Sequence, residues 1–290
     1  MKVLLFTNMT TTASSQRLQP ICEWLAERGI EYDLFSSGIF EEKDPSFEEL
    51  SASITQYNLL CSFGGDGTTL RAAHVVGKTG IPLLSYNFGR LGFLSGACVD
   101  DLIPAMQAAI DGKLSLDART ILDVSVTYED GTINHQIAVN ELVVSRGHFG
   151  RIVELDLSIN GTFINTVRGD GVLVATPTGS TGYALSAGGP IISVAHDGMC
   201  VVPISPHSLT TRAIVTTGND VIGIVPNASN RQRLVLFIDG EVLWIASTDD
   251  KKQPVGIEVS VCPEKLQLVR FGDYDFFDHI SRTFFRGNDA

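Results

Sequence analysis

The stretch FGGDGTTL, residues 63–70, decides the fold of the first part of the chain. It follows an apolar run, so the chain leaves a buried strand through Gly64 and Gly65. Glycine has no side chain and tolerates positive φ, which lets bare backbone N–H groups approach an anion. A helix beginning near Thr68 would add its N-terminal donors and its dipole. Taken alone, Asp66 is either a turn residue or a reacting carboxylate, and the two threonines are equally suited to capping.

Outward from this stretch, short apolar runs alternate with helix-like segments. The predicted strands are Val3–Thr7, Tyr32–Phe35, Leu59–Phe63 and Pro82–Tyr86, and the predicted helices run from a Ser14-Ser15 cap to Gly29 and from Thr68 to Gly77. Such alternation indicates an α/β domain with a parallel, Rossmann-like sheet covered by helices. These sheets bind ligands at the carboxyl ends of their strands, where the glycine-rich stretch lies.

From Leu122 onward, apolar residues recur with period two, which is typical of antiparallel sheet. The predicted strands are Leu122–Tyr128, Ile133–Ser145, Leu155–Ile159, Val172–Ala175, Arg233–Ile238, Val255–Val261 and Leu266–Phe271. The pattern predicts a mostly-β, sandwich-like second domain. We expect an α/β domain over 1–117, a β-rich domain over 118–272 and a helical C-terminal segment over 273–290 whose docking is open.

Composition excludes several classes of protein. The 290 residues are 44% hydrophobic, enough for a buried core. A formal charge of −12 argues against a nucleic-acid or membrane partner. The five scattered cysteines show no zinc spacing, and the apolar run after Met1 is too short for a signal peptide or a membrane span. We expect a cytoplasmic protein with reduced thiols.

A second unusual segment runs from Arg168 to Pro190. Its apolar strand is followed by small and hydroxyl-bearing residues, which form either a ligand-hugging loop or ordinary turns. Ser180 resembles the nucleophile of a G-x-S-x-G elbow, but Thr178 replaces the first glycine, so a hydrolase is not favoured. The histidines suggest no triad or metal site, and His207 has a structural role as its simplest explanation.

The pair Asn140-Glu141 interrupts an otherwise β-like apolar run. A polar pair is costly to bury without partners. Either the pair faces solvent, or it meets a polar ligand such as a ribose, whose two adjacent hydroxyls suit an amide beside a carboxylate.

Together these segments resemble the NAD kinase family, which transfers the terminal phosphoryl group of ATP, or in some members polyphosphate, to the 2′-hydroxyl of the adenosine ribose of NAD. The resemblance rests on GGDGT at 64–68, NFGRLGF at 87–93, Asn140-Glu141 and the run from Gly169 to Pro190. It spans most of the chain. GGDGT alone is shared with lipid kinases and phosphofructokinases, whereas GDGxLxxTPTGSTxY beside an upstream Asn-Glu is specific.

The resemblance implies that Asp66 accepts the proton of the attacking hydroxyl, with Phe93 against the adenine region. It implies a phosphate loop of Gly64, Gly65, Gly67 and Thr68, and NAD contacts from Asp66, Gly67, Arg71, Phe93, Asn140, Glu141, Arg151, Arg168, Asp170, Thr181, Gly182, Tyr183, Ala184, Leu185 and Ser186. Glu241 stands where many members have glutamine, so no role is carried over to it.

The resemblance also implies an active site between the two domains and a homotetramer or homodimer in which one subunit completes the site of another. Because the chain is acidic, Mg²⁺ or Mn²⁺ is expected with the ATP phosphates, and no side chain is assigned to the metal. Two alternatives stay open: a diacylglycerol- or sphingosine-type lipid kinase, and a non-catalytic NAD(P) sensor.

Overall fold

The structure, a computed structural model, describes residues 1–7, 12–36, 45–89, 92–113, 115–148, 150–228, 234–245 and 253–286. They form two compact units. The first joins Met1–Arg119 to the C-terminal part from Glu264, and the second is Thr120–Pro263. The first is an α/β unit with a mostly parallel sheet and the second is built of antiparallel sheets, which confirms the expected fold class.

The first unit is organised around a sheet with the strand order β2-β1-β3-β4-β19-β6, with β5 also paired to β4. Its strands are β1 (Lys2–Thr7), β2 (Glu31–Ser36), β3 (Leu59–Phe63), β4 (Leu83–Asn87), β5 (Ala97–Cys98), β6 (Ser115–Arg119) and β19 (Leu266–Arg270). Neighbours from β2 to β19 run parallel, and β6 is antiparallel to β19. The central strand β3 is buried along its whole length, as a strand covered on both faces must be.

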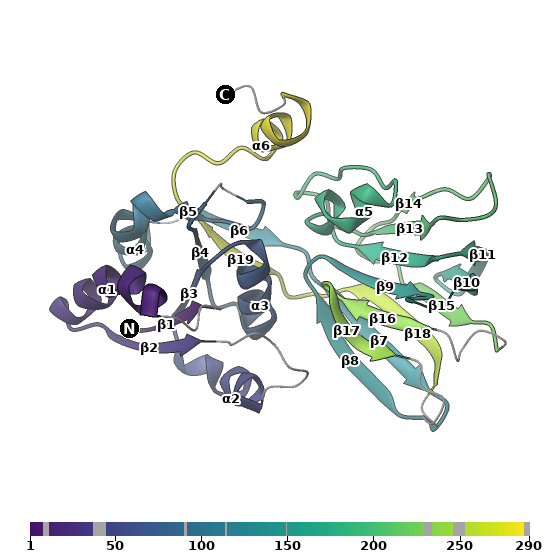
Figure 1. Cartoon of the computed structure of the whole chain (residues 1–290), viewed down its shortest axis with the longest axis horizontal. Helices are drawn as coiled ribbons and strands as arrows, with labels where there is room; N and C mark the ends of the chain where they lie inside the picture. The colour runs from purple at the N-terminus through teal and green to yellow at the C-terminus, as the bar shows by residue number, and fades with distance from the viewer. Residues whose placement is uncertain are drawn as a thin grey trace. The chain divides into compact units, whose positions relative to one another are not determined.

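Helices cover both faces of this sheet (Figure 1). They are α1 (Thr12–Glu27), α2 (Pro45–Ser53), α3 (Asp66–Val76) and α4 (Leu102–Ile110), with short 3₁₀ turns at Ile54–Gln56 and Val99–Asp101. Ile21 of α1 and Met106 of α4 share one core cluster with Leu5 and Leu84 of the sheet. Helix α3 lies on the opposite face, beside the point where β3 ends (Figure 1).

Both predicted helix starts in this unit were wrong. Ser14 and Ser15 lie inside α1 rather than at its cap. Helix α3 begins at Asp66, two residues before the expected start, with Gly65 as its N-cap. The reason is that the backbone of Gly65 is extended and its carbonyl already accepts the N–H groups of Thr68 and Thr69, at 3.0 and 3.1 Å.

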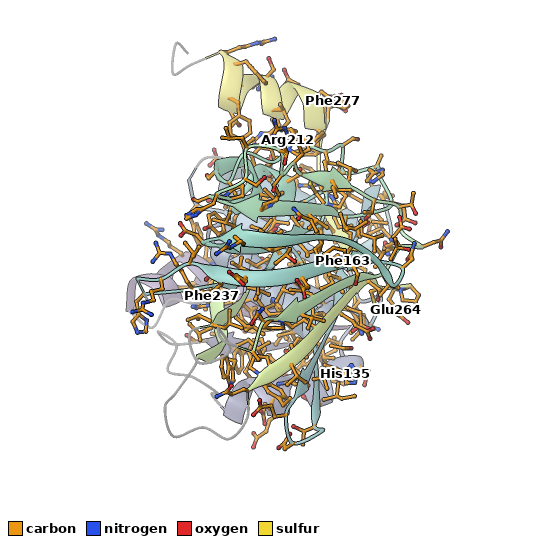
Figure 2. The ribbon with its side chains drawn as sticks, turned by 90° about the vertical axis from the view of Figure 1, so that its right-hand side faces the viewer. His135, Phe163, Arg212, Phe237, Glu264 and Phe277 are labelled. Atoms are coloured by element: carbon orange, nitrogen blue, oxygen red, sulfur yellow. The ribbon has the colours of Figure 1, made fainter. Side chains whose placement is uncertain are left out.

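The second unit consists of two antiparallel sheets with the orders β11-β10-β15-β18-β7-β8 and β14-β13-β12-β9-β16-β17. The strands of the first of these are β7 (Leu122–Tyr128), β8 (Ile133–Ala138), β10 (Val153–Ile159), β11 (Thr162–Gly169), β15 (Ile222–Pro226) and β18 (Pro254–Val261). Those of the second are β9 (Glu141–Ser145), β12 (Gly171–Ala175), β13 (Cys200–Ile204), β14 (Ile214–Val215), β16 (Val235–Ile238) and β17 (Glu241–Ile245). Figure 2 shows this unit with side chains, with Phe163 of β11 and His135 of β8 labelled.

One core lies between these two sheets, and it draws alternate residues from each strand, such as Val124 and Val126 of β7 and Val172 and Val174 of β12. The opposite face of β12 is covered as well. Leu173 and Ala175 pack against Ala184 of α5 (Tyr183–Ser186), which follows a 3₁₀ turn at Gly179–Thr181. Strand β12 is therefore buried on both faces, which explains its continuous apolar sequence.

The prediction of a single strand over Ile133–Ser145 was wrong. The chain bends at Val139 and Asn140, so that β8 belongs to one sheet and β9 to the other. Consecutive apolar residues stand on both sides of the bend, Ile137-Ala138-Val139 before Asn140 and Leu142-Val143-Val144 after Glu141, so the sequence pattern did not reveal the switch.

The assignment of Leu266–Phe271 to the β-rich domain was also wrong. As β19, this strand lies between β4 and β6 in the sheet of the first unit. The strand is real, but its period of two says nothing about which sheet it joins. Arg233, where another strand was expected to begin, lies outside the described residues, and β16 is described from Val235.

The C-terminal segment, residues 272–286, is part of the first unit. It contains α6 (Phe276–Ile280), capped by the Asp275 side chain that accepts the Asp278 N–H at 2.7 Å, and a π-helical turn at Ser281–Phe285. Phe276 and Ile280 are buried. Throughout the described parts of the chain, no helix combines the length and apolarity needed to cross a bilayer.

Candidate functional site

The first glycine of the turn after β3, Gly64, has no room for a side chain. The Gly64 N–H donates to the Tyr86 carbonyl at 3.0 Å, and a Cβ at Gly64 would lie 2.3 Å from Oγ1 of Thr68. Gly65 and Gly67 are exposed, and a Cβ at either would meet nothing within 4 Å. The turn is thus closed on the Thr68 side and open on the side where a phosphate could approach.

The carboxylate of Asp66 is held by the loop that follows β4. Its Oδ2 accepts the backbone N–H of Phe93 at 3.0 Å, and its Oδ1 accepts the Ser95 hydroxyl at 3.3 Å. A Cβ at Gly92 would lie only 2.1 Å from Oδ1, so that position requires glycine. Asp66 makes these bonds outside its own turn, and its side chain stays partly exposed. It is a pre-oriented carboxylate at the carboxyl end of the sheet.

The two threonines have different roles. Thr69 is fully buried, donates to the Gly65 carbonyl at 3.4 Å and lies 3.3 Å from the Ser62 hydroxyl, which is a structural role. Thr68 is buried against Gly64. Arg71 follows on α3, partly exposed, and its chain position brings it one turn beyond the glycine loop.

Arg270 anchors the loop that holds Asp66. Its guanidinium donates to the carbonyl of Ser95 and, at 3.0 Å, to the carbonyl of Phe93. Its Nε also bonds Oδ2 of Asp117 at 3.0 Å, the oxygen that Arg119 contacts at 2.7 Å. Burial lowers the pKa of Arg270 below its usual value, while contact with Asp117 opposes that effect. Sequence reasoning missed Arg270, and no local motif marks it.

In the second unit, the bend at Asn140-Glu141 is built around Asp239. Its carboxylate accepts the backbone N–H groups of Val139, Asn140 and Glu141 at 2.7, 2.7 and 2.9 Å. Asp239 and Gly240 have φ values of 52° and 83°, which is the type I′ hairpin turn between β16 and β17. This role of Asp239 was not predicted, although an Asp-Gly pair is a signal for this type of turn.

The side chain of Glu141 is buried, at 6% exposure, and does not face solvent. Within the described part of the chain, its Oε2 has no hydrogen-bond partner. Burial, and then the charge of Asp239, raise the pKa of Glu141 to about 7. A buried carboxylate oxygen without a partner is costly, and an incoming donor would relieve that cost. This excludes the solvent-facing alternative for Glu141, while Asn140 is half-buried.

The turn after β12 packs directly on this bend. The Thr176 hydroxyl donates to the Val139 carbonyl at 2.6 Å, and a Cβ at Gly179 would lie 2.2 Å from the Asn140 carbonyl oxygen. A Cβ at Gly182 would lie 3.8 Å from Oε2 of Glu141. The structure therefore brings the predicted Thr181–Ser186 stretch beside the Asn-Glu pair.

The side chains of this stretch differ in availability. Tyr183 and Ser186 are exposed, Thr181 and Leu185 are half-buried, and Ala184 is fully buried in the core. Ser180 is also fully buried, donates to the Pro177 carbonyl at 2.6 Å and accepts the Ile192 N–H at 3.0 Å. It is a structural hydroxyl and not an accessible nucleophile.

Asp170 and Arg168 lie away from this cluster. Gly171 pairs with Ser145 and Ala175 pairs with Glu141, so Asp170 stands at the opposite end of β12 from the Asn-Glu bend. The four-residue step corresponds to about 13 Å along a strand.

These two residues are held by ion pairs. Asp170 contacts Nε of Arg146 at 2.5 Å, and this bond lowers the pKa of Asp170. Arg168 is 2.9 Å from Glu154 and largely exposed, and Arg151 is exposed before β10. The backbone of His207 donates to the Arg168 carbonyl at 2.8 Å, a structural role.

Of the NFGRLGF motif, Arg90 and Leu91 lie outside the described residues. Asn87 closes the rest of the loop by accepting the Gly89 N–H at 2.9 Å and donating to Ser95 at 3.3 Å. In the parts of the chain that the structure describes, no group of three or more His, Cys, Asp or Glu side chains is placed to hold a metal ion.

Two family models match this chain. One described as the ATP-NAD kinase N-terminal domain matches residues 3–114, and one described as the ATP-NAD kinase C-terminal domain matches residues 139–271. Among curated proteins, the chain is 34% identical over 261 residues to the NAD kinase of Aromatoleum aromaticum, covering 90% of this chain and 83% of that protein. It is 30% identical over 280 residues to the NAD kinase of a Geobacter species, covering 96% of each.

Two solved structures share the fold. The yeast NADH kinase in complex with NADH gives a TM-score of 0.84 at 24% identity, covering 100% of this chain and 89% of that one. The NAD kinase of Archaeoglobus fulgidus in complex with ATP gives 0.72 at 22% identity, covering 93% and 94%.

Proposed function

The chain belongs to the NAD kinase family, and on that premise we propose which of its residues carry the reaction. It is a phosphotransferase that uses ATP to convert NAD to NADP. Membership in this family sets aside both the lipid kinase and the non-catalytic sensor.

Asp66 is the proposed acceptor of the proton from the 2′-hydroxyl of the adenosine ribose. A sugar hydroxyl is a poor nucleophile near neutral pH, so a carboxylate within hydrogen-bond reach assists as the new P–O bond forms. The observation that carries this role is that Phe93 and Ser95 orient both oxygens of Asp66 and Gly92 leaves room for them. General-base assistance accounts for about 10²–10⁴-fold. The rest of the acceleration comes from alignment and charge neutralisation.

Glycines of the loop after β3 are the proposed phosphate cradle. Gly65 and Gly67 leave the N-terminal backbone of α3 open to the solvent, and this end of an eleven-residue helix favours anionic groups. Gly64 and Thr68 shape the turn. Arg71 is proposed as a cation for the phosphates.

Asn140 and Glu141 are proposed to bind the ribose hydroxyls of NAD, together with the stretch Thr181–Ser186. Oε2 of Glu141 lacks a partner among the described residues, and a ribose hydroxyl would supply the missing donor. In this stretch, Ala184 contributes through its backbone, because its side chain belongs to the core. Phe93, which is partly exposed, keeps its proposed contact with adenine.

A divalent cation, Mg²⁺ or Mn²⁺, is proposed to accompany ATP. The described residues offer no cluster of three or more ligating side chains, and this fits a metal held mainly by phosphate oxygens and water. When bound, the metal would neutralise charge on the transferred phosphoryl group. Asp66 is the carboxylate within the glycine loop at 64–68, the proposed phosphate cradle.

A homodimer or homotetramer is proposed as the functional assembly. Gly171 lies about 13 Å along β12 from Ala175, the residue that pairs with Glu141, and Asp170 and Arg168 precede Gly171 in the chain. That separation supports a role in which Asp170, Arg168 and Arg151 contact the dinucleotide held by a neighbouring copy. Light scattering on the purified protein measures the assembly, and a monomer at assay concentration would contradict the proposal.

A cytoplasmic location and the use of polyphosphate in place of ATP are predictions of the same kind. Cell fractionation tests the first. Replacing ATP by polyphosphate in the NADP-forming assay tests the second.

The decisive experiment is Asp66→Asn. We expect the variant to fold and to bind NAD with near-normal affinity, while kcat for NADP formation falls by about 10²–10⁴-fold. Thermal unfolding and calorimetric titration of NAD provide the controls. A near-normal kcat would remove Asp66 from the chemistry.

A further inference from the structure

Phe93 is surrounded by side chains from the C-terminal segment. The ring of His279 meets the Phe93 ring edge to face, with centroids 4.4 Å apart and planes at 82°. Phe284 stacks on it at 5.9 Å and 16°, and Phe276 approaches its edge at 6.4 Å. Residues nearly two hundred positions later in the chain thus fix the orientation of this ring.

Phe93 is also the residue whose backbone N–H binds Asp66 at 3.0 Å. A displacement of its ring therefore moves the donor that orients Oδ2 of the carboxylate. The carbonyl of the same residue accepts a bond from Arg270, whose guanidinium lies 3.9 Å from the centroid of the Tyr274 ring. The C-terminal part of the chain holds Phe93 at its ring and at its carbonyl.

We propose that His279 and Phe284 are positioning residues for phosphoryl transfer, because they hold Phe93 and, through it, the carboxylate of Asp66. This inference rests on the proposed role of Asp66. It assigns a function to the segment after β19, which is not part of the glycine loop or of the bend at Asn140-Glu141.

Packing rather than charge is the basis of the His279 contribution. Burial lowers the pKa of His279, with Asp66 and Asp278 opposing that effect and Arg270 and Arg282 adding to it. The lowered pKa favours the neutral imidazole, and its edge-to-face contact with Phe93 needs no charge. A phenyl ring in its place would keep that contact.

The test measures kcat and both KM values for His279→Ala, His279→Phe and Phe284→Ala in the full-length protein. We expect each alanine variant to lower kcat by about tenfold, since small misplacements of catalytic groups cost this much or more. KM for ATP should change by less than about twofold, while KM for NAD should rise because Phe93 also has a proposed contact with adenine. His279→Phe should restore kcat to near the unmodified level.

Matched controls come from the same segment. Phe277, labelled in Figure 2, and Phe285 are 65% and 74% exposed, and alanine at either should leave kcat unchanged. Phe284→Leu is the second variant at its site if alanine reduces folding, and thermal unfolding monitors all variants. A loss of kcat in the Phe277 and Phe285 controls equal to that in Phe284→Ala would overturn the proposal.

A double-mutant cycle with Asp66→Asn separates the two hypotheses. If His279 acts through Asp66, His279→Ala should cause no further loss in the Asp66→Asn background. An equal tenfold loss in both backgrounds, or a change confined to KM, would overturn the positioning role. An increase in activity would also overturn it, because the segment would then be blocking a ligand from Phe93. A fully active Asp66→Asn protein would instead contradict the proposed role of Asp66 itself.

Discussion

Among single residues, Gly92 shows how closely the backbone approaches the proposed catalytic carboxylate. Since a Cβ there would lie 2.1 Å from Oδ1 of Asp66, Gly92→Ala must displace either the carboxylate or the loop. We expect kcat to fall by about a hundredfold, with smaller changes in KM for NAD and ATP. Steady-state kinetics with both substrates measures the effect.

The control for this prediction is Gly89→Ala in the same loop. A Cβ at Gly89 would lie 3.7 Å from Oδ1 of Asn87, an ordinary contact. Its kcat should stay near that of the unmodified protein. Equal losses in the two variants would mean that the loop tolerates no side chain anywhere, and the argument from Asp66 would fail.

From the raised pKa of Glu141 we predict that NAD binding depends on pH. Its pKa is raised from 4.5 to about 7, and only the ionised carboxylate accepts donors from both ribose hydroxyls. KM for NAD should therefore fall as pH rises through 7, and Glu141→Gln should flatten that dependence and raise KM for NAD. KM for ATP in the same titration is the reference, and a parallel change in both would contradict a dinucleotide role.

The same shift has a consequence for stability. Glu141 loses its proton near pH 4.5 in the unfolded chain but near pH 7 in the folded protein. Between these two values the folded state binds the additional proton, so the free energy of unfolding falls as pH rises from 4.5 to about 7. Above pH 7 the buried charge costs on the order of 3 kcal/mol, as a rise in pKa from 4.5 to about 7 implies. A site for NAD explains why such a cost would persist.

At the scale of elements, the bend between β8 and β9 depends on one aspartate from the β16–β17 hairpin. Asp239→Ala would leave three backbone N–H groups without the carboxylate that accepts them. We expect a loss of about 3 kcal/mol in the free energy of unfolding and a higher KM for NAD, because Asn140 and Glu141 would lose their orientation. Urea unfolding and kinetics measure the two effects.

Asp130→Ala is the matched control. Asp130 also accepts a backbone N–H and a hydroxyl, both from Thr132, but in an exposed hairpin turn. Its loss should cost less than about 1 kcal/mol and leave KM unchanged. A similar cost at both sites would show that the bend does not depend on Asp239.

Elements differ in how far they could be predicted. Strands such as β3, β7 and β18 follow from runs or alternation of apolar residues, and the turn of Asp239-Gly240 from its dipeptide. The neighbours of a strand in its sheet cannot be predicted from such patterns. The apolar pattern of β19 would be the same whether this strand paired with β4 or with a strand of the second unit. The start of α3 at Asp66 was not predicted because its N-cap residue is Gly65, which has an extended backbone and no side chain that could signal a cap.

For the whole molecule, the discontinuous first unit predicts how fragments behave. Residues 120–263 contain both antiparallel sheets and their common core, so we expect this fragment to fold alone. Residues 1–119 lack β19, which stands between β4 and β6, so we expect this fragment not to fold cooperatively. Circular dichroism during denaturant unfolding distinguishes the two outcomes.

A joined fragment serves as the control. Arg119 and Leu266 face each other across the antiparallel β6–β19 pair, so a short turn can connect residue 119 to residue 264. This joined chain should regain a cooperative transition. Cooperative unfolding of residues 1–119 without β19 would contradict the importance of that strand for the first unit.

The fold class follows from the local periodicity of the sequence by itself, and the family follows from the resemblance carried by GGDGT at 64–68 and the run from Gly169 to Pro190. The same resemblance singles out Asp66 and the Asn140-Glu141 pair as candidate site residues. Only the tertiary structure decided that Gly92, Ser95 and Arg270 fix Asp66, that Asp239 builds the bend, and that His279 packs on Phe93. Those contacts join residues that lie far apart along the chain, and local patterns carry no information about which distant segments meet.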